Sequence, residues 1–302
     1  MLSDSNAAKS LYATAFYYHS VVRLSVLADS LGKTAEAEKL ANLGVRIKDS
    51  YNAKFLRTNK DGNYSYLCNT QTDDALSLGF GLCPSEKVKA DILKSLVSSL
   101  REDHYRITMG VLGLYAVYKA LCQNGFTDVA YRMITQTSYP SWGYWIKHGA
   151  TTCWEFWSGR GSRDHGFLGG RLNAFLVKYL AGISPISPGY GRIRIEPGVV
   201  GDLKNAEAKV YSVRGLVSSD WSRKNSTSLD LKIQVPPNAT ADVFVPLLKL
   251  KSSEAIVQEG SQVVFDMGAG TQNRYVSYVG KKYGCLVFKV GSGNYEFKLR
   301  PN

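Results

Sequence analysis

The chain has 302 residues, 44% of them hydrophobic and 21% charged, which is typical of a globular protein with one large or two medium domains. Its 37 lysines and arginines outnumber 25 acidic residues, but they are interspersed and form no run of five, which favours a solvated surface over a nucleic-acid footprint. Residues 1–9 are mostly polar and no stretch of about 18 apolar residues follows, so we expect neither an export signal nor a membrane span, with the cytoplasm as the default location.

The five cysteines are widely spaced and odd in number: Cys68, Cys83, Cys122, Cys153 and Cys285. No two of them form a CxxC pair, which disfavours a disulfide framework or a zinc site. Most of them are therefore expected to be small buried hydrophobic side chains. We expect neither a metal nor another cofactor.

Hydrophobic residues recur at three- and four-residue steps through the first part of the chain, which indicates amphipathic helices. The predicted helices cover about residues 10–31, 34–55, 72–82, 85–99, 109–122, 126–136 and 166–181. Helices of this length joined by short loops are typical of antiparallel packing in bundles, solenoids or helical toroids. No strict repeat is visible, which disfavours a consensus solenoid. Residues 138–144 are aromatic and are predicted to be irregular.

The periodicity changes near Pro185 and Pro188. Beyond them hydrophobic and polar residues alternate, as in residues 229–235, and about nine short strands are separated by glycine-containing turns. The predicted fold class is therefore mainly α with an all-β domain. A helical (α/α) domain is expected over residues 1–184 and a small antiparallel β-sandwich over residues 185–302.

The segment GATTCWEFW ends at Trp157 and places Glu155 directly after Trp154. Indole rings on both sides would desolvate the carboxylate and make it a usable base or acid near neutral pH. Their flat apolar faces could also stack on the C–H face of a sugar ring. The alternative is a structural glutamate, salt-bridged to Arg160 or Arg163 inside an aromatic core.

Five blocks of sequence together carry a family resemblance. They are ATAFYY at 13–18, TQT at 70–72 with GFGL at 79–82, YPSWGY at 139–144, GATTCWE at 149–155, and PGY from 188 onward. With these blocks the chain resembles the carboxy-terminal part of bacterial α-L-rhamnosidases of glycoside hydrolase family 78. The YPSWGY and GATTxWE pair is the specific part of the resemblance, which spans nearly the whole chain.

The resemblance implies a partial (α/α)6 toroid closed by the sandwich, and hydrolysis of terminal α-L-rhamnosides with inversion. It makes Glu155 the general base, acting on a water with an acid about 6.5–9.5 Å away. Side chains expected to contact the sugar are Trp142, Tyr144, Trp154, Trp157 and His165. The alternatives are a core histidine bonded to a carbonyl at His165 and plain aromatic core at Trp142 and Tyr144. The expected ligand is a rhamnose-containing glycoside or oligosaccharide, with no nucleic acid or membrane as partner.

The chain also departs from the family. The family's general acid lies in an acidic segment upstream of the blocks present here, and about seven helices are predicted where the toroid needs twelve. The family's asparagine before histidine is Asp164 here, and its Ala-Tyr after TQT is Asp73-Asp74. Asp73, Asp74, Asp103 and Asp164 are disfavoured as substitute acids, because a general acid must face the base across the substrate.

Two classes of function follow. The first is an α-L-rhamnosidase, or a relative acting on another terminal glycoside, completed by a missing N-terminal half on a longer parent protein or a partner chain. The second is a non-catalytic sugar-binding or structural remnant that associates through its open helical edge, for example as a homo-oligomer. A third reading, a lyase for acidic polysaccharides, draws on the net charge of +12 and is less favoured.

Overall fold

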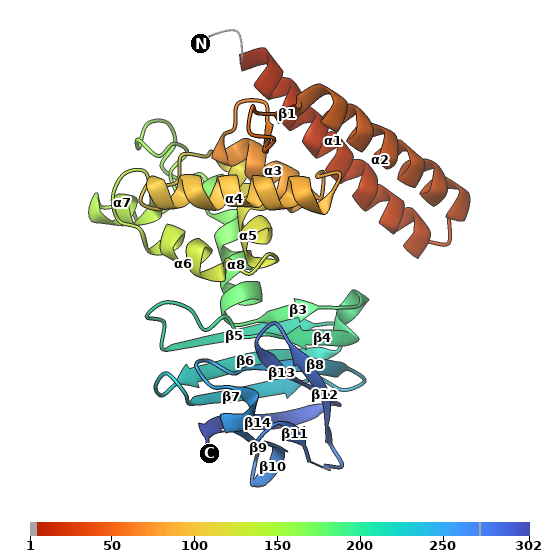
Figure 1. Cartoon of the computed structure of the whole chain (residues 1–302), viewed down its shortest axis with the longest axis vertical. Coiled ribbons are helices and arrows are strands. Elements are labelled where there is room, and N and C mark those ends of the chain that lie inside the picture. The colour runs from red at the N-terminus through yellow and green to blue at the C-terminus, as the bar shows by residue number, and fades with distance from the viewer. Residues whose placement is uncertain (1–4, 272) are drawn as a thin grey trace. The chain divides into compact units, whose positions relative to one another are not determined.

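The computed structural model describes residues 5–271 and 273–302. The chain divides into two compact units, Met1–Arg171 and Leu172–Asn302. Figure 1 shows that the first consists mainly of helices and the second mainly of sheets. The predicted fold class, helices followed by an all-β domain, is confirmed. No helix among the described residues is long and apolar enough to cross a membrane.

The helical unit begins with a long antiparallel hairpin and continues through shorter helices. Its elements are α1 (Ser5–Ser30), α2 (Thr34–Phe55), a two-stranded sheet of β1 (Leu56–Thr58) and β2 (Tyr64–Tyr66), α3 (Gln71–Phe80), α4 (Glu86–Glu102), α5 (Val111–Cys122), α6 (Thr127–Thr135) and α7 (Trp142–Lys147). Its core gathers apolar side chains from successive helices, among them Leu11, Tyr51, Leu76, Ile92 and Ala116.

Helix α3 is fixed at both ends and along its face by local chemistry. The Thr70 hydroxyl accepts a hydrogen bond from the Asp73 backbone N–H, and the Asp73 side chain accepts from the Thr70 N–H, which forms a capping box. The helix ends at Gly81, whose left-handed φ of 76° suits glycine. A Cβ on Gly79 would lie 2.8 Å from the Ala116 carbonyl oxygen, so α3 and α5 approach closely.

Three local predictions are wrong. The helix predicted over residues 166–181 is instead a 3₁₀ turn η1 (Gly166–Leu168), a short α8 (Gly170–Phe175) and a π-helical turn η2 (Leu176–Leu180). The segment predicted to be irregular contains α7, because the Ser141 hydroxyl caps it by accepting from the Tyr144 N–H. Most cysteines are not buried, since Cys68 is exposed and Cys83, Cys122 and Cys153 are only half-buried.

The second unit is a sandwich of two sheets that share one apolar core. Its strands are β3 (Ile183–Pro185), β4 (Arg192–Ile195), β5 (Asn205–Ser212), β6 (Gly215–Arg223), β7 (Leu229–Val235), β8 (Thr240–Pro246), β9 (Ala255–Glu259), β10 (Gln262–Asp266), β11 (Ala269–Gly270), β12 (Val276–Lys282), β13 (Cys285–Val290) and β14 (Gly293–Pro301). The seven-stranded sheet has the order β11-β10-β9-β14-β7-β6-β5, and the five-stranded sheet the order β12-β13-β8-β4-β3. Strands β4 and β8 pair in parallel, and the other pairs among the described strands are antiparallel.

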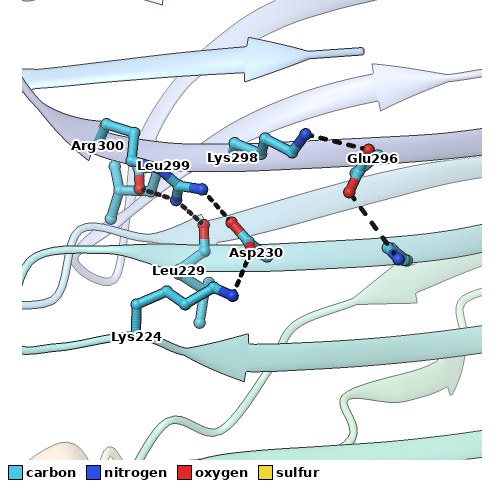
Figure 2. A network of polar contacts seen from close by, with 8 residues as sticks. Lys224, Leu229, Asp230, Glu296, Lys298, Leu299 and Arg300 are labelled. Atoms are coloured by element: carbon cyan, nitrogen blue, oxygen red, sulfur yellow. Dashed lines mark hydrogen bonds and ion pairs between the residues drawn. The ribbon is translucent and has the colours of Figure 1, made fainter.

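Strand β7 shows the predicted alternation, with Leu229, Leu231, Ile233 and Val235 buried in the core. The two charged side chains between them, Asp230 and Lys232, form ion pairs with residues of β14. Figure 2 shows this network of ion pairs. Arg300 pairs with Asp230, which also lies 3.4 Å from the Lys224 ammonium. Although partial burial opposes it, these two cations hold the pKa of Asp230 below its usual value.

Candidate functional site

The GATTCWEFW segment lies in a loop that follows α7 and folds back on itself. The Glu155 backbone N–H donates to the Ser162 carbonyl at 2.9 Å, and the His165 N–H donates to the Cys153 carbonyl at 2.8 Å. These two bonds hold residues 153–165 as an irregular hairpin within the helical unit. The loop therefore has a defined path without belonging to a helix or sheet.

The Glu155 side chain is half-buried, and one of its oxygens is held by the loop. Oε2 accepts a hydrogen bond from the Ser162 backbone N–H at 2.9 Å. A Cβ on Gly161 would lie 2.5 Å from this oxygen, and Gly161 has a φ of 75°. Glycine is therefore the residue at 161 that leaves room for the carboxylate in this position. The other oxygen, Oε1, has no protein hydrogen-bond partner within the described part of the chain.

The alternative of a structural salt bridge does not match the contacts of this loop. Among the described residues, no ion pair involves Glu155. The Arg163 guanidinium lies over the Trp154 ring instead, 5.1 Å from its centroid, and Arg160 is exposed. Glu155 thus keeps a carboxylate that no neighbouring cation neutralises.

Four tryptophans form a cluster beside this loop, two from α7 and two from the loop itself. Trp145, which the sequence analysis did not select, is at its centre: its ring centroid lies 4.7 Å from that of Trp157 and 5.7 Å from that of Trp154. Trp142 packs edge-on to Trp157 at 5.3 Å. The Trp145 Nε1 donates to the Trp157 carbonyl, and the Trp157 Nε1 donates to the Met109 carbonyl before α5.

This packing divides the tryptophans that were predicted to contact the sugar into two buried ones and one half-buried one. Trp142 and Trp154 are only 7% and 6% exposed, so their rings contribute to an aromatic core rather than to an open platform. Trp157 is half-buried and retains accessible surface. Trp145 follows the YPSWGY block and lies on α7, in a segment that was predicted to be irregular, so no helical spacing pointed to it.

Tyr144 and His165 are both half-buried. The Tyr144 ring lies 3.9 Å from the His148 ring and packs edge-on to Tyr139. The His165 ring packs edge-on to Phe167, whose side chain is 71% exposed. These side chains are near enough to solvent to meet a ligand.

The four aspartates considered as substitute acids have other roles or positions. Asp73 and Asp74 are 0% and 1% exposed, Asp73 in the capping box and Asp74 against α4. Asp103 pairs with Arg106. Asp164 is exposed and belongs to the same loop as Glu155.

Asp74 has an environment that favours its neutral form. The Ser95 hydroxyl lies 2.7 Å from Asp74 Oδ2 and 3.1 Å from Asn69 Oδ1, and one hydroxyl proton serves one acceptor at a time. A protonated Asp74 can donate to Ser95, which leaves the Ser95 proton for Asn69. Burial raises the pKa of Asp74 to about 7, although the hydrogen bond from Ser95 acts to lower it, and the Asp73 charge beside it also raises it.

The described residues contain no group of three or more His, Cys, Asp or Glu side chains arranged to hold a metal ion. The chemistry that the loop offers is therefore that of a carboxylate with one fixed and one open oxygen, next to half-buried aromatic rings.

Comparisons with known proteins agree with this picture. Residues 3–180 match the model of the bacterial alpha-L-rhamnosidase 6 hairpin glycosidase domain, and residues 182–260 match that of the bacterial alpha-L-rhamnosidase C-terminal domain. An alpha-L-rhamnosidase of Streptomyces avermitilis is 31% identical over 304 residues, which cover 96% of this chain and 27% of that protein.

Two solved structures have the same fold. The alpha-L-rhamnosidase of Dictyoglumus thermophilum aligns with a TM-score of 0.81 at 30% identity, covering 95% of this chain and 31% of that one. The Streptomyces avermitilis alpha-L-rhamnosidase complexed with L-rhamnose aligns with a TM-score of 0.82 at 30% identity, covering 96% and 27%. The chain thus spans less than a third of the length of these relatives. Because the six-hairpin model alone matches more than half of the chain, the protein belongs to the bacterial α-L-rhamnosidase family.

Proposed function

We propose that this chain provides the general base and part of the sugar pocket of an inverting α-L-rhamnosidase whose general acid comes from other polypeptide. The observation that carries the proposal is the Glu155 carboxylate, with Oε2 bonded to the Ser162 N–H and Oε1 open. The match to rhamnosidase domains and the L-rhamnose bound to the Streptomyces avermitilis relative support the choice of sugar.

In this mechanism Glu155 Oε1 takes a proton from a water as that water attacks the anomeric carbon. The Ser162 N–H and the small Gly161 keep the carboxylate from rotating away, which preserves its orientation toward the water. A carboxylic acid on the opposite side of the sugar protonates the departing oxygen. Half-buried Trp157, Tyr144 and His165 would contact the sugar.

A chimera gives the direct test. This chain replaces the matching region of the Streptomyces avermitilis relative, and hydrolysis of an aryl α-L-rhamnoside is followed. Glu155→Gln should lower kcat by about 10²- to 10⁴-fold with little change in KM, as expected for the loss of a general base. Asp164→Asn, the same carboxylate-to-amide change in the same loop, should leave kcat nearly unchanged. Equal kcat values for the parent chimera and Glu155→Gln would exclude Glu155 as the base.

The second candidate is a sugar-binding protein without turnover, which the half-buried rings of Trp157, Tyr144 and His165 beside the loop favour. It predicts that L-rhamnose at millimolar concentration raises the melting temperature of the isolated chain. It also predicts that the chimera hydrolyses no aryl rhamnoside. Turnover by the chimera that depends on Glu155 would exclude it.

A further inference from the structure

Basic side chains from three helices gather around the ring of Tyr115 in α5. The Arg171 guanidinium of α8 lies over this ring, 3.5 Å from its centroid, and the His19 ring of α1 packs edge-on to it at 5.8 Å. Arg23 follows His19 by four residues on α1, and Lys119 follows Tyr115 by four residues on α5. Residues four apart lie on the same side of a helix. We call His19, Arg23, Lys119 and Arg171 the basic cluster.

Aromatic rings support this cluster from below. The His19 ring stacks on Phe80 at the end of α3, with the two centroids 4.2 Å apart, and Phe80 packs edge-on to Tyr115 at 5.9 Å. Phe16 of α1 lies 5.1 Å from Phe80 and 5.5 Å from Tyr115. These three rings belong to the core of the helical unit or pack against it. They therefore fix the positions of the imidazole and guanidinium groups that contact them.

No carboxylate balances these charges in the described part of the chain. None of the ion pairs there involves His19, Arg23 or Arg171. Burial, and then the positive charges of Arg23, Lys119 and Arg171, lower the pKa of the His19 imidazole. His19 thus lies in a positive field to which three side chains contribute.

A grouping of this kind favours an anion. His19, Lys119 and Arg171 are half-buried, and Arg23 is exposed. Positive charges held together repel one another, more strongly where water is partly excluded, and an anion between them replaces this repulsion by attraction. The planar fork of a guanidinium matches two oxygens of a carboxylate, phosphate or sulfate. The cluster therefore has the chemistry of a site for an oxyanion.

We propose that the basic cluster binds an oxyanion, held by the guanidinium groups of Arg23 and Arg171 together with the ammonium of Lys119. L-rhamnose carries no charge, so the sugar pocket of the proposed function does not account for this cluster. The same carboxylate, sulfate or phosphate chemistry can come from an inorganic ion or from an acidic sugar. The inference rests on the side chains around Tyr115 and does not depend on the role of Glu155.

Nuclear magnetic resonance of the 302-residue chain tests the proposal through His19, which is one of four histidines. Sodium sulfate should raise the pKa of His19 along a curve that saturates with concentration, because a bound anion offsets the charges that lower this pKa. Sodium chloride at equal ionic strength should not reproduce that curve. The resonances of the other three histidines should not follow it.

Substitutions locate the binding site. Arg171→Gln and Arg23→Gln, made separately, should each weaken sulfate binding by about tenfold or more, as expected for the loss of a charged hydrogen-bond donor. Arg23 is exposed, so its substitution keeps the test valid if Arg171→Gln disturbs folding. Arg132→Gln is the matched control and should leave binding unchanged. Arg132 also lies over a tyrosine ring, 5.3 Å from the centroid of Tyr105, but does not belong to the cluster.

D-glucuronate and inorganic sulfate distinguish the two sources of the oxyanion. Tighter binding of glucuronate assigns the site to an acidic sugar, whereas binding of sulfate that is at least as tight assigns it to an inorganic ion. Neutral D-glucose should not compete with either. The proposal is overturned if His19 responds to sulfate, phosphate and glucuronate no more than to chloride, or if Arg132→Gln weakens binding as much as Arg23→Gln. None of these measurements uses rhamnoside hydrolysis, so their outcome is separate from that of the catalytic proposal.

Discussion

The two units of the chain differ in how completely each satisfies its own side chains. In the sandwich, apolar residues of both sheets share one core, and the charged residues of β7 and β14 pair across strands. In the helical unit, Leu24 and Leu27 of α1 are 50% and 54% exposed. Within the described part of that unit, buried polar atoms without hydrogen-bond partners include Asp73 Oδ1, Asp74 Oδ1 and Trp142 Nε1. Among the described residues, the sandwich thus pairs its charged side chains across strands, whereas the helical unit leaves apolar side chains exposed and buried polar atoms unpaired.

The largest expected effect tests the independence of the sandwich. Trp221 is fully buried, and its Nε1 donates to the Leu180 carbonyl at 2.8 Å. Trp221→Ala should destabilise the second unit by about 3–5 kcal/mol, because it leaves a cavity and an unpaired carbonyl. Urea unfolding should show the same loss in the isolated chain and in the chimera. A loss that differs between the two would mean that the sandwich is not independent.

The next largest effect is a dependence of the stability of the helical unit on pH. The pKa of Asp74 is raised to about 7 from 3.8, so its contribution to stability is complete below pH 3.8 and is lost as pH rises through about 7. Asp74→Asn removes this loss. It should raise stability relative to the parent chain by roughly 2–4 kcal/mol at pH 8 and leave it nearly unchanged at pH 4.

Urea midpoints of the two proteins at pH 4, 6 and 8 measure this difference directly. Asp164→Asn, the same carboxylate-to-amide change at an exposed position, is the matched control. A difference between Asp74→Asn and the parent that does not grow with pH would mean that Asp74 is ionised in the folded protein throughout this range.

A smaller effect on stability with a larger effect on activity is expected at Gly161. Gly161→Ala places a methyl group 2.5 Å from Glu155 Oε2, too close for both atoms to stay, and requires a positive φ of an alanine, at a cost of about 1 kcal/mol. Displacement of the carboxylate should lower kcat of the chimera by about tenfold or more. Unchanged kcat would show that the position of Oε2 is unimportant. Gly159→Ala is the matched control, because its added methyl group would meet the Trp154 ring and not the Glu155 carboxylate.

The smallest effect is expected on the outer face of the sandwich. Asp230→Asn removes a partly exposed ion-pair partner of Arg300 and Lys224 and should cost about 1 kcal/mol or less at neutral pH. Because its folded pKa is lowered, that contribution should disappear as pH falls through the folded pKa. Thermal melts at pH 7 and pH 3 check this. A loss as large as that of Trp221→Ala would show that the ion pairs, rather than the core, hold the sheets.

Much of the fold could be predicted from periodicity. Helix α2 has the predicted bounds, 34–55, because its apolar spacing is regular and Gly32 precedes it. The alternation of β7 likewise predicted which side chains face the core. The π-helical turn η2 could not be predicted, because it depends on a hydrogen bond from the Ala181 N–H to the Leu176 carbonyl, five residues back instead of four. The short α7 was also missed, because it depends on the cap that the Ser141 hydroxyl forms with the Tyr144 N–H.

The candidate site was predicted less completely. The motif pointed to Glu155, but the bond that positions its carboxylate comes from the backbone of Ser162, whose side chain carries no signal for it. Burial of Trp154 involves the ring of Trp145, and burial of Trp142 involves the ring of Trp157, and only the folded chain brings these pairs together. The buried position of Asp74 was equally hidden, because an acidic residue in a first helical turn is usually exposed.

The central claim is that Glu155 activates the attacking water, and azide tests it most directly because this anion attacks without needing a base. The Glu155→Gln chimera should regain turnover of an aryl α-L-rhamnoside when azide is added, and nuclear magnetic resonance should identify the product as rhamnosyl azide with inverted configuration. Turnover that azide does not restore, or an azide product of retained configuration, would contradict the assignment of Glu155 as the base of an inverting rhamnosidase.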